Sequence, residues 1–223
     1  MTAVTEHDRR AVVRDSLGVA IATGTYGLSF GAVGVAAGLD VAQTCALSLL
    51  MFTGASQFAL VGVLGSGGTP LAGALTALLL GTRNTLYGLK MAPLLGYRGW
   101  RRAAAAQVLI DESTAMSLGR PTRALARTGF LTTGVTIFVL WNLTTLVGAA
   151  VGEQLGDPRD LGLDAAVGAA FLALLWPRLS TPALRVTAVL AALVAAAAVT
   201  VTPAGVPVLV AAGVAVLVGA LRR

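Results

Sequence analysis

The chain has 223 residues, of which 56% are hydrophobic and 12% charged, and its mean hydropathy is +0.82. Soluble domains carry about 25% charged residues, so this composition excludes an ordinary soluble protein and predicts an integral membrane protein. The formal net charge is +6. We expect no nucleic-acid partner, because the basic residues lie in short loops between apolar runs, as the positive-inside rule predicts for membrane proteins.

The few cysteine and histidine residues limit the chemistry further. Cys45 lies in an apolar run and has no second cysteine to form an internal disulfide. His7 lies in the polar N-terminal tail. These positions exclude a cysteine-cluster metal site, a histidine-ligated metal and a histidine-based triad within the membrane. We therefore expect neither a metal ion nor a cofactor.

The N-terminal region predicts a tail followed by a glycine-striped span. Met1–Asp15 is polar and lacks a cleavable signal pattern, which indicates a cytoplasmic tail. Ser16–Ala37 is long enough to cross the hydrocarbon. Glycines recur from this span into the next loop at alternating spacings of three and four residues, which places them on one helical stripe: Gly24, Gly27, Gly31, Gly34 and Gly38. Such a stripe is typical of close helix packing; alternatively it gives a smooth track for a substrate or a moving helix.

The next apolar run, Val41–Leu64, is interrupted by small and polar residues at Thr53–Gln57. Irregular polar backbone is tolerated at membrane depth only where it lines a cavity or is buried in protein. The segment is therefore either a packed helix whose polar side chains bond to a neighbour or a broken helix that contributes to a site. We favour the broken helix.

The run Leu71–Lys90 holds Arg83 and Asn84 within apolar sequence. A charge at bilayer depth is unfavourable by a few kcal/mol or more, so it usually faces a cavity or an opposite charge. Arg83 has three possible roles. It grips a carboxylate bidentately, it neutralises an acidic residue, or it extends to the membrane surface from the end of its span.

The only acidic residues embedded in apolar sequence are Asp111 and Glu112, in the marginally long run Ala103–Gly119. Adjacent residues on a helix point about 100° apart, so one cavity cannot easily use both carboxylates. We expect one of them to face the cavity and the other to pair with a base such as Arg83. A buried ion pair that only holds helices together is the alternative.

The remaining spans are more uniformly apolar, and the whole chain, residues 1–223, reads as a single transmembrane domain. The remaining spans are Gly129–Val151, Leu161–Trp176, Ala183–Val201 and Val208–Leu221. An acidic loop, Glu153–Asp160, lies between the first two of them. The fold class is therefore an all-α, polytopic helix bundle.

Two topologies fit these segments. Eight crossings place both termini on one side but leave the basic loop at Arg98–Arg102 outside the cell. Six full spans, with Val41–Leu64 and Ala103–Gly119 broken or re-entrant, place both termini in the cytoplasm. All lysines and arginines except Arg83 and Arg159 are then cytoplasmic. In this second arrangement, the polar breaks at Gly54–Gln57 and Asp111–Ser113 approach the midplane from opposite faces, as in transporters with inverted repeats.

Three blocks carry a family resemblance: GASQF at Gly54–Phe58, TRNTLYGLK at Thr82–Lys90 and DES at Asp111–Ser113. In this order and spacing they resemble the AzlC family, the large subunit of branched-chain amino acid exporters. The resemblance implies export of hydrophobic amino acids across the cell membrane, together with a small AzlD-like membrane subunit. The candidate substrate-binding residues are Gly54, Ser56, Gln57, Phe58, Arg83, Asn84, Asp111, Glu112 and Ser113. The chain departs from the family at Asn84, where a histidine is common.

We expect a membrane permease that exports branched-chain or other hydrophobic amino acids by alternating access. An intramembrane enzyme that uses the acidic pair and a structural membrane subunit are the alternatives. The absence of histidine and of a metal-ligand cluster near the acidic pair favours transport over enzymatic activity.

Overall fold

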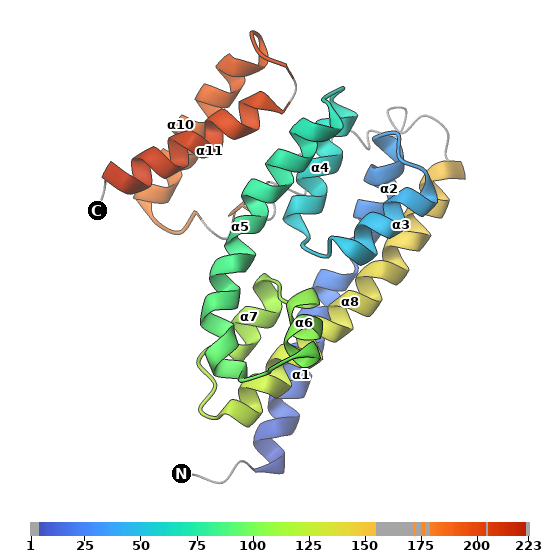
Figure 1. The fold of residues 1–223 in the computed structure, drawn as a ribbon, viewed down its shortest axis with the longest axis vertical. Coiled ribbons are helices and arrows are strands. Elements are labelled where there is room, and N and C mark those ends of the chain that lie inside the picture. The colour runs from blue at the N-terminus through green and yellow to red at the C-terminus, as the bar shows by residue number, and fades with distance from the viewer. Residues whose placement is uncertain (1–4, 155–171, 173–174, 177–178, 204, 222–223) are drawn as a thin grey trace.

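The computed structural model describes residues 5–154, 172, 175–176, 179–203 and 205–221. The regular structure throughout this part of the chain is helical, which confirms the all-helical class (Figure 1). The helices are α1 (Glu6–Gly24), α2 (Gly27–Ala36), α3 (Val41–Leu50), α4 (Ala55–Gly65), α5 (Pro70–Leu95), α6 (Trp100–Gln107), α7 (Asp111–Ser117), α8 (Arg123–Gln154), α10 (Pro182–Val199) and α11 (Val206–Leu221). Most of the expected span Leu161–Trp176 and most of the acidic loop Glu153–Asp160 lie outside the described residues.

Among the described residues, three helical stretches are long and apolar enough to cross a membrane. They are Glu6–Ala36, Arg123–Gln154 and Pro182–Val199. The first consists of α1 and α2, which are separated by a short turn at Thr25 and Tyr26. It begins at a capping box, in which Thr5 and Asp8 each bond the other's backbone N–H.

The glycine stripe packs the first long stretch against α8. A Cβ on Gly27 would meet the Trp141 carbonyl oxygen, and a Cβ on Gly31 would meet the Thr145 carbonyl oxygen. The residue numbers rise together on both helices, so α2 and α8 run parallel. In addition, the Thr144 hydroxyl donates to the Gly24 carbonyl oxygen at 2.7 Å. Glycine occupies these positions of α2 because the backbones of α2 and α8 are in contact, which leaves no room for a Cβ.

The last two glycines of the stripe lie elsewhere. Gly34 faces α3, since its Cβ would lie 2.6 Å from Thr44 Cγ2. Gly38 does not pack against a helix, contrary to our expectation. It has a φ of +90°, and apart from its chain neighbours no atom of the described residues lies within 4 Å of the position that a Cβ would take. It is a glycine because the turn between α2 and α3 needs a left-handed residue.

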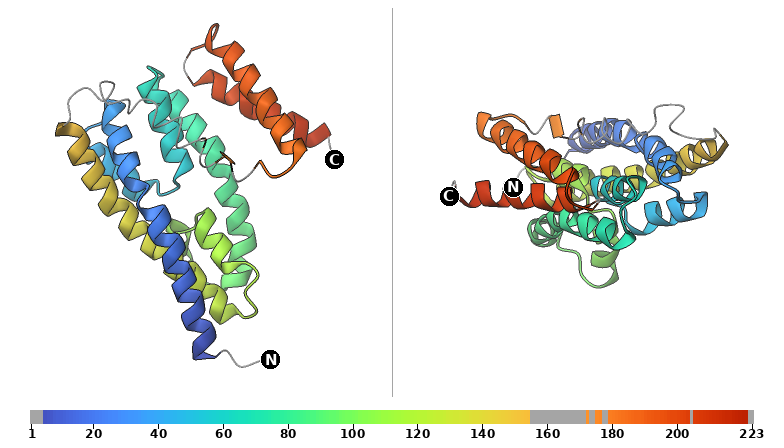
Figure 2. Two further views of the ribbon diagram at one scale, coloured as in Figure 1. Left: turned by 180° about the vertical axis from the view of Figure 1, so that it is seen from behind. Right: turned by 90° about the horizontal axis from the view of Figure 1, so that it is seen from above.

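Two helix pairs, α3–α4 and α6–α7, each reverse direction at an irregular break (Figures 1 and 2). The α3–α4 pair enters the bundle from the end opposite the N-terminus and returns to that same end. The α6–α7 pair enters from the N-terminal end and returns there. Between them, α5 runs the length of the bundle. It starts with Thr69 as N-cap and Pro70 in its first turn and ends at Gly96 in the left-handed conformation.

The breaks lie slightly before the positions that we predicted. The first covers Met51–Gly54, and the second covers Val108–Ile110. The interruption predicted at Asp111–Ser113 is therefore wrong in position, because these residues form the first turn of α7. Polar residues favour this position since they satisfy free backbone groups at the start of a helix.

Charge divides the two ends of the bundle. The N-terminus, the α5–α6 connection and the α7–α8 connection share one end (Figure 1). This end carries Arg98 and Arg120 in the connections and Arg101, Arg102 and Arg123 in the first turns of α6 and α8, together with three acidic residues of α1, Glu6, Asp8 and Asp15. The other end carries Asp40 and Glu153 and none of these arginines. We refer to the two as the basic end and the acidic end.

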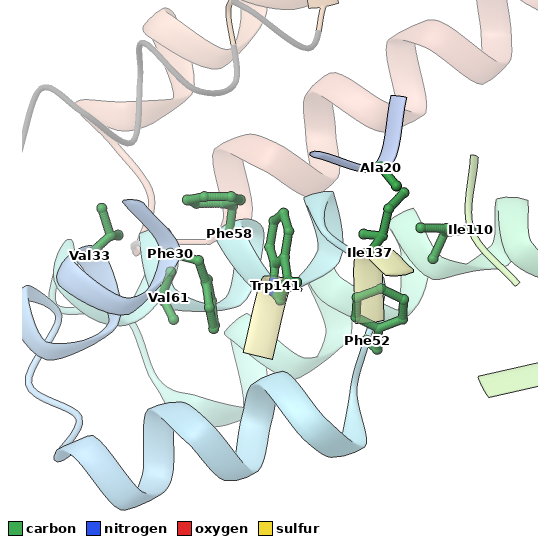
Figure 3. Packing of buried hydrophobic residues seen from close by; sticks show 9 residues of the cluster. All are labelled: Ala20, Phe30, Val33, Phe52, Phe58, Val61, Ile110, Ile137 and Trp141. Atoms are coloured by element: carbon green, nitrogen blue, oxygen red, sulfur yellow. The ribbon is translucent and has the colours of Figure 1, made fainter. Parts of the chain in front are cut away.

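The described residues form two buried hydrophobic clusters, one that includes Met91, Leu95 and Phe130 and one built around aromatic rings beside the first break (Figure 3). The ring centroids of Phe30 and Phe58 lie 5.5 Å apart in an edge-to-face arrangement, and those of Phe58 and Trp141 lie 6.2 Å apart. Phe52, which belongs to the break itself, contacts Phe138 at 5.1 Å. Both sides of the break are thereby held against α8.

The α10–α11 hairpin lies at the side of this bundle (Figures 1 and 2). No residue of α10 is buried. Apolar side chains exposed along an entire helix are typical of a lipid-facing surface, because a soluble protein rarely exposes such an area.

Candidate functional site

Arg83 lies near the middle of α5. It is 13 residues beyond Pro70 and 12 before Leu95, so at 1.5 Å per residue it is about 18–20 Å from either end of the helix. The surface-reaching role that we considered for Arg83 needs a position at the end of its span, and its place in the middle of α5 does not favour that role.

The Arg83 guanidinium connects the two helix breaks. Its Nη1 lies 3.0 Å from Asp111 Oδ2, at the start of α7. Its Nη2 donates to the Thr53 carbonyl oxygen in the first break at 3.1 Å. The side chains of Arg83 and Asp111 are only 23% and 22% exposed, respectively. The acid that pairs with Arg83 is therefore Asp111, and the paired charges lie between the tips of two helix pairs that enter from opposite ends.

Gln57 stabilises the first break from within. Its Oε1 accepts the backbone N–H groups of Gly54 at 3.0 Å and Thr53 at 3.4 Å, and its Nε2 donates to the Leu47 carbonyl oxygen at 3.3 Å. One buried amide thus satisfies backbone groups within the break and in the last turn of α3. Gly54 has a φ of +65°, which a residue with a Cβ adopts only with strain. These bonds turn the Thr53 carbonyl toward Arg83.

Ser113 plays a similar part in the second break. Its fully buried hydroxyl accepts the Ile110 N–H at 3.0 Å and donates to the Val108 carbonyl oxygen at 2.7 Å. Val108 in turn contacts α8, where a Cβ on Gly134 would lie 2.7 Å from its carbonyl oxygen. The break is thus fixed against α8, and Asp111 follows directly from it. Glu112 is half-buried in the same turn of α7.

Polar atoms near the first break are buried without a hydrogen-bond partner. They are Ser56 Oγ, Asn84 Oδ1 and Arg83 Nε. Ser56 is only 1% exposed, and its hydroxyl faces α5, where a Cβ on Gly81 would lie 3.6 Å away. Buried polar atoms of this kind are unfavourable unless something bonds to them, so a polar ligand at this position would find hydrogen-bonding partners.

The predicted binding residues thus divide by position. Arg83, Asn84, Asp111 and Ser56 lie where α5 meets the two breaks, whereas Gln57 and Ser113 use their side chains to hold the breaks in shape. Phe58 lies in the aromatic core, where its ring contacts those of Phe30 and Trp141 (Figure 3). Substrate contact by each of these residues stays a prediction.

Two groups that the structure brings to the site are not among the predicted binding residues. One is the Thr53 carbonyl oxygen, whose direction depends on the shape of the break and leaves no trace in the sequence. The other is Gln107, whose Nε2 donates to the Leu49 carbonyl oxygen at the end of α3 at 2.8 Å. A glutamine that ends the alanine run at Ala103–Ala106 is a weak signal of such a contact. The two helix pairs are therefore joined directly as well as through Arg83.

The two charged groups of this site could pair with the opposite charges of a small zwitterion. A guanidinium can bind a carboxylate, and a carboxylate such as that of Asp111 can bind an ammonium group. Within the described residues there is no group of three histidine, cysteine, aspartate or glutamate side chains placed to hold a metal ion.

A family model described as AzlC protein matches residues 18–155. This match covers more than half of the chain and includes both helix breaks and Arg83. The chain belongs to the AzlC family. The resemblance in the three sequence blocks is thereby confirmed.

Relatives of this AzlC-family chain occur in Helicobacter pylori. Two proteins, from strains J99 and 26695, are each described as "Uncharacterized membrane protein" and are 27% identical to it over 150 residues. The similarity covers 66% of this chain and 65% of each relative. No solved structure matches the chain. The family and these relatives support a membrane protein of a transport-associated family.

Proposed function

We propose that this protein is the transport subunit of an exporter for branched-chain or other small hydrophobic amino acids and works by alternating access in the cell membrane. The observation that carries this proposal is the Arg83–Asp111 pair, held near the middle of the bundle between two helix breaks. A partly buried charge pair is weak evidence for stability, and ionisable groups at this depth usually belong to a substrate or ion pathway.

Substrate recognition follows from the charges. The carboxylate of an amino acid competes with Asp111 for the Arg83 guanidinium, and the released Asp111 carboxylate meets the substrate ammonium. Exchange of one ion pair for two keeps every charge compensated, which matters where water is scarce. An acid–base role for Asp111 in an enzyme is less well supported, because its Oδ2 already pairs with Arg83.

The topology that we propose has six crossings, with α3–α4 and α6–α7 re-entrant. Under the positive-inside rule the basic end faces the cytoplasm, so the N-terminus is cytoplasmic, and so is the C-terminus if the total is six. The tips of the two re-entrant pairs then meet Arg83 near the midplane, where transporters with broken helices bind their substrates. Family membership adds a small AzlD-like membrane subunit as the expected partner.

The test is transport by the reconstituted complex. The protein is co-purified with its small subunit and placed in liposomes loaded with unlabelled leucine, and counterflow of radiolabelled leucine is measured. We expect Arg83→Gln to lower the rate at least 100-fold, because the substrate carboxylate loses its cation. Arg102→Gln, which removes a charge from the exposed α6, serves as the matched control and should retain wild-type flux. Wild-type flux in Arg83→Gln would exclude the proposed site.

A second arm separates carboxylate recognition from general damage to the fold. Isoamylamine has the leucine side chain and amine but no carboxylate. We expect an excess of isoamylamine to leave leucine counterflow unchanged, whereas the same excess of valine should compete. Equal competition by the amine would mean that Arg83 does not select the carboxylate.

A further inference from the structure

A cavity of about 600 Å³ lies between α4, α5 and the connection of α10 to α11. Figure 1 shows these elements together toward the acidic end. Apolar atoms dominate its wall, which includes Ala59, Val63, Leu80 and Val208. The proposed function leaves this cavity without a role.

The three hydroxyl groups in the cavity wall are already bonded to their own helices. Ser66 donates to the Gly62 carbonyl oxygen at 2.6 Å, Thr76 to that of Ala72 at 2.9 Å, and Thr202 to that of Ala198 at 2.7 Å. A ligand in this space therefore finds few free hydrogen-bonding groups. The cavity suits an aliphatic group rather than a polar one.

The inner end of the cavity adjoins the Arg83 site. On α5, Thr76, Leu80 and Arg83 follow one another at spacings of four and three residues, so they share one face of the helix. On α4, Ala59 follows Ser56 by one turn. The Ser56 hydroxyl faces Gly81, the residue after Leu80. The apolar wall and the polar centre are thus neighbouring parts of one surface.

The start of α4 supplies a place for a carboxylate at this junction. An α-helix leaves the N–H groups of its first turn without intrahelical acceptors, and these groups with the helix dipole favour an anion. Ser56 stands in this first turn, is 1% exposed and has no hydrogen-bond partner for its hydroxyl. The nearby Thr53 carbonyl oxygen accepts a hydrogen bond from Arg83 Nη2 at 3.1 Å, so the positive charge of the guanidinium lies close to the start of α4.

We infer that this cavity binds the aliphatic side chain of the transported amino acid, whose carboxylate lies at the start of α4 beside Ser56 and Arg83. This inference rests on the proposed function and adds the residues that set side-chain size. Ser56 and Ala59 are about one helical turn, 5 Å, apart, a distance that a branched aliphatic side chain spans. A lipid acyl chain is the competing occupant, but its methyl end would leave the Ser56 hydroxyl without a partner.

The experiment changes the size of the inner end and measures selectivity. Ala59→Leu fills the cavity next to Ser56, and Leu80→Ala enlarges it. In the reconstituted complex, counterflow is measured with alanine, leucine and phenylalanine. We expect Ala59→Leu to lower the ratio of leucine to alanine flux at least tenfold, and Leu80→Ala to raise the ratio of phenylalanine to leucine flux at least fivefold.

Ala196→Leu is the matched control, because Ala196 is exposed on α10 and does not line the cavity. It should keep the wild-type ratios. Unchanged ratios in both cavity variants, with normal wild-type flux, would overturn the inference and leave the proposed function standing. Absence of amino acid flux in the wild-type complex would overturn both. If Ala59→Leu lowers every flux equally and also removes a phospholipid seen by native mass spectrometry, the cavity is a lipid site and the inference is wrong.

Discussion

Removal of the Asp111 carboxylate leaves Arg83 partly buried and without the charge that compensates it. In Asp111→Ala the guanidinium keeps its bond to the Thr53 carbonyl oxygen, which is a neutral acceptor. The double variant Arg83→Ala/Asp111→Ala removes both charges together. The comparison of the single variants with the double variant therefore isolates the interaction between the two side chains.

The magnitude follows from the geometry. With Nη1 and Oδ2 at 3.0 Å, Coulomb attraction at an effective dielectric of 20 is about 5.5 kcal/mol. Desolvation offsets much of this attraction. Removal of one partner of a buried pair typically lowers stability by about 3–5 kcal/mol. Both side chains retain about a fifth of their exposure. We therefore expect each single variant to lose about 3 kcal/mol of stability, the lower end of this range.

The assay is thermal unfolding of the purified complex in lipid nanodiscs. A loss of about 3 kcal/mol lowers Tm by about 6–12 °C in a protein of this size. We expect the double variant to be about 2 kcal/mol more stable than the sum of the two single losses predicts. This difference should persist at high salt, because salt screens a partly buried pair only weakly. Additive losses, with a coupling below about 0.5 kcal/mol, would refute the reasoning.

Three further predictions concern helix packing, the first break and the membrane topology. Gly27→Ala forces a methyl group against the backbone of α8 and should lower Tm by several degrees, whereas Gly18→Ala, with open space around it, should be neutral or stabilise α1 by up to about 1 kcal/mol. Gln57→Leu leaves the backbone groups of the first break unsatisfied, which should destabilise the protein by about 2–3 kcal/mol; unchanged hydrogen exchange in the break would contradict this. Cysteines placed at Ser66 and Arg101, on a background without the native cysteine, should react with impermeant maleimide from the outside at Ser66 and from the cytoplasmic side at Arg101. The reverse pattern, which eight crossings predict, or labelling of both from one side would exclude the proposed topology.

The sequence determined the features that depend on local composition. Apolar runs of about 20 residues identified membrane helices, because a helix must bury its backbone groups across the hydrocarbon. Small and polar residues at Thr53–Gln57 indicated a broken helix for the same reason, and α3 and α4 confirm it. The glycine stripe predicted a close helix contact, since its period matches the helical repeat.

Tertiary structure alone decided which groups meet. The sequence offered Asp111 and Glu112 equally as partners of Arg83, because the rotation of α7 about its axis depends on how the second break packs against α8. It also offered Gln57 as a substrate ligand, although its amide bonds to the backbone of its own break. The cavity beside Ala59 and Leu80 is formed by helices far apart in the chain, and no local pattern encodes it. Contacts of this kind depend on the relative placement of whole helices, which is set by the sum of many packing interactions rather than by any one segment.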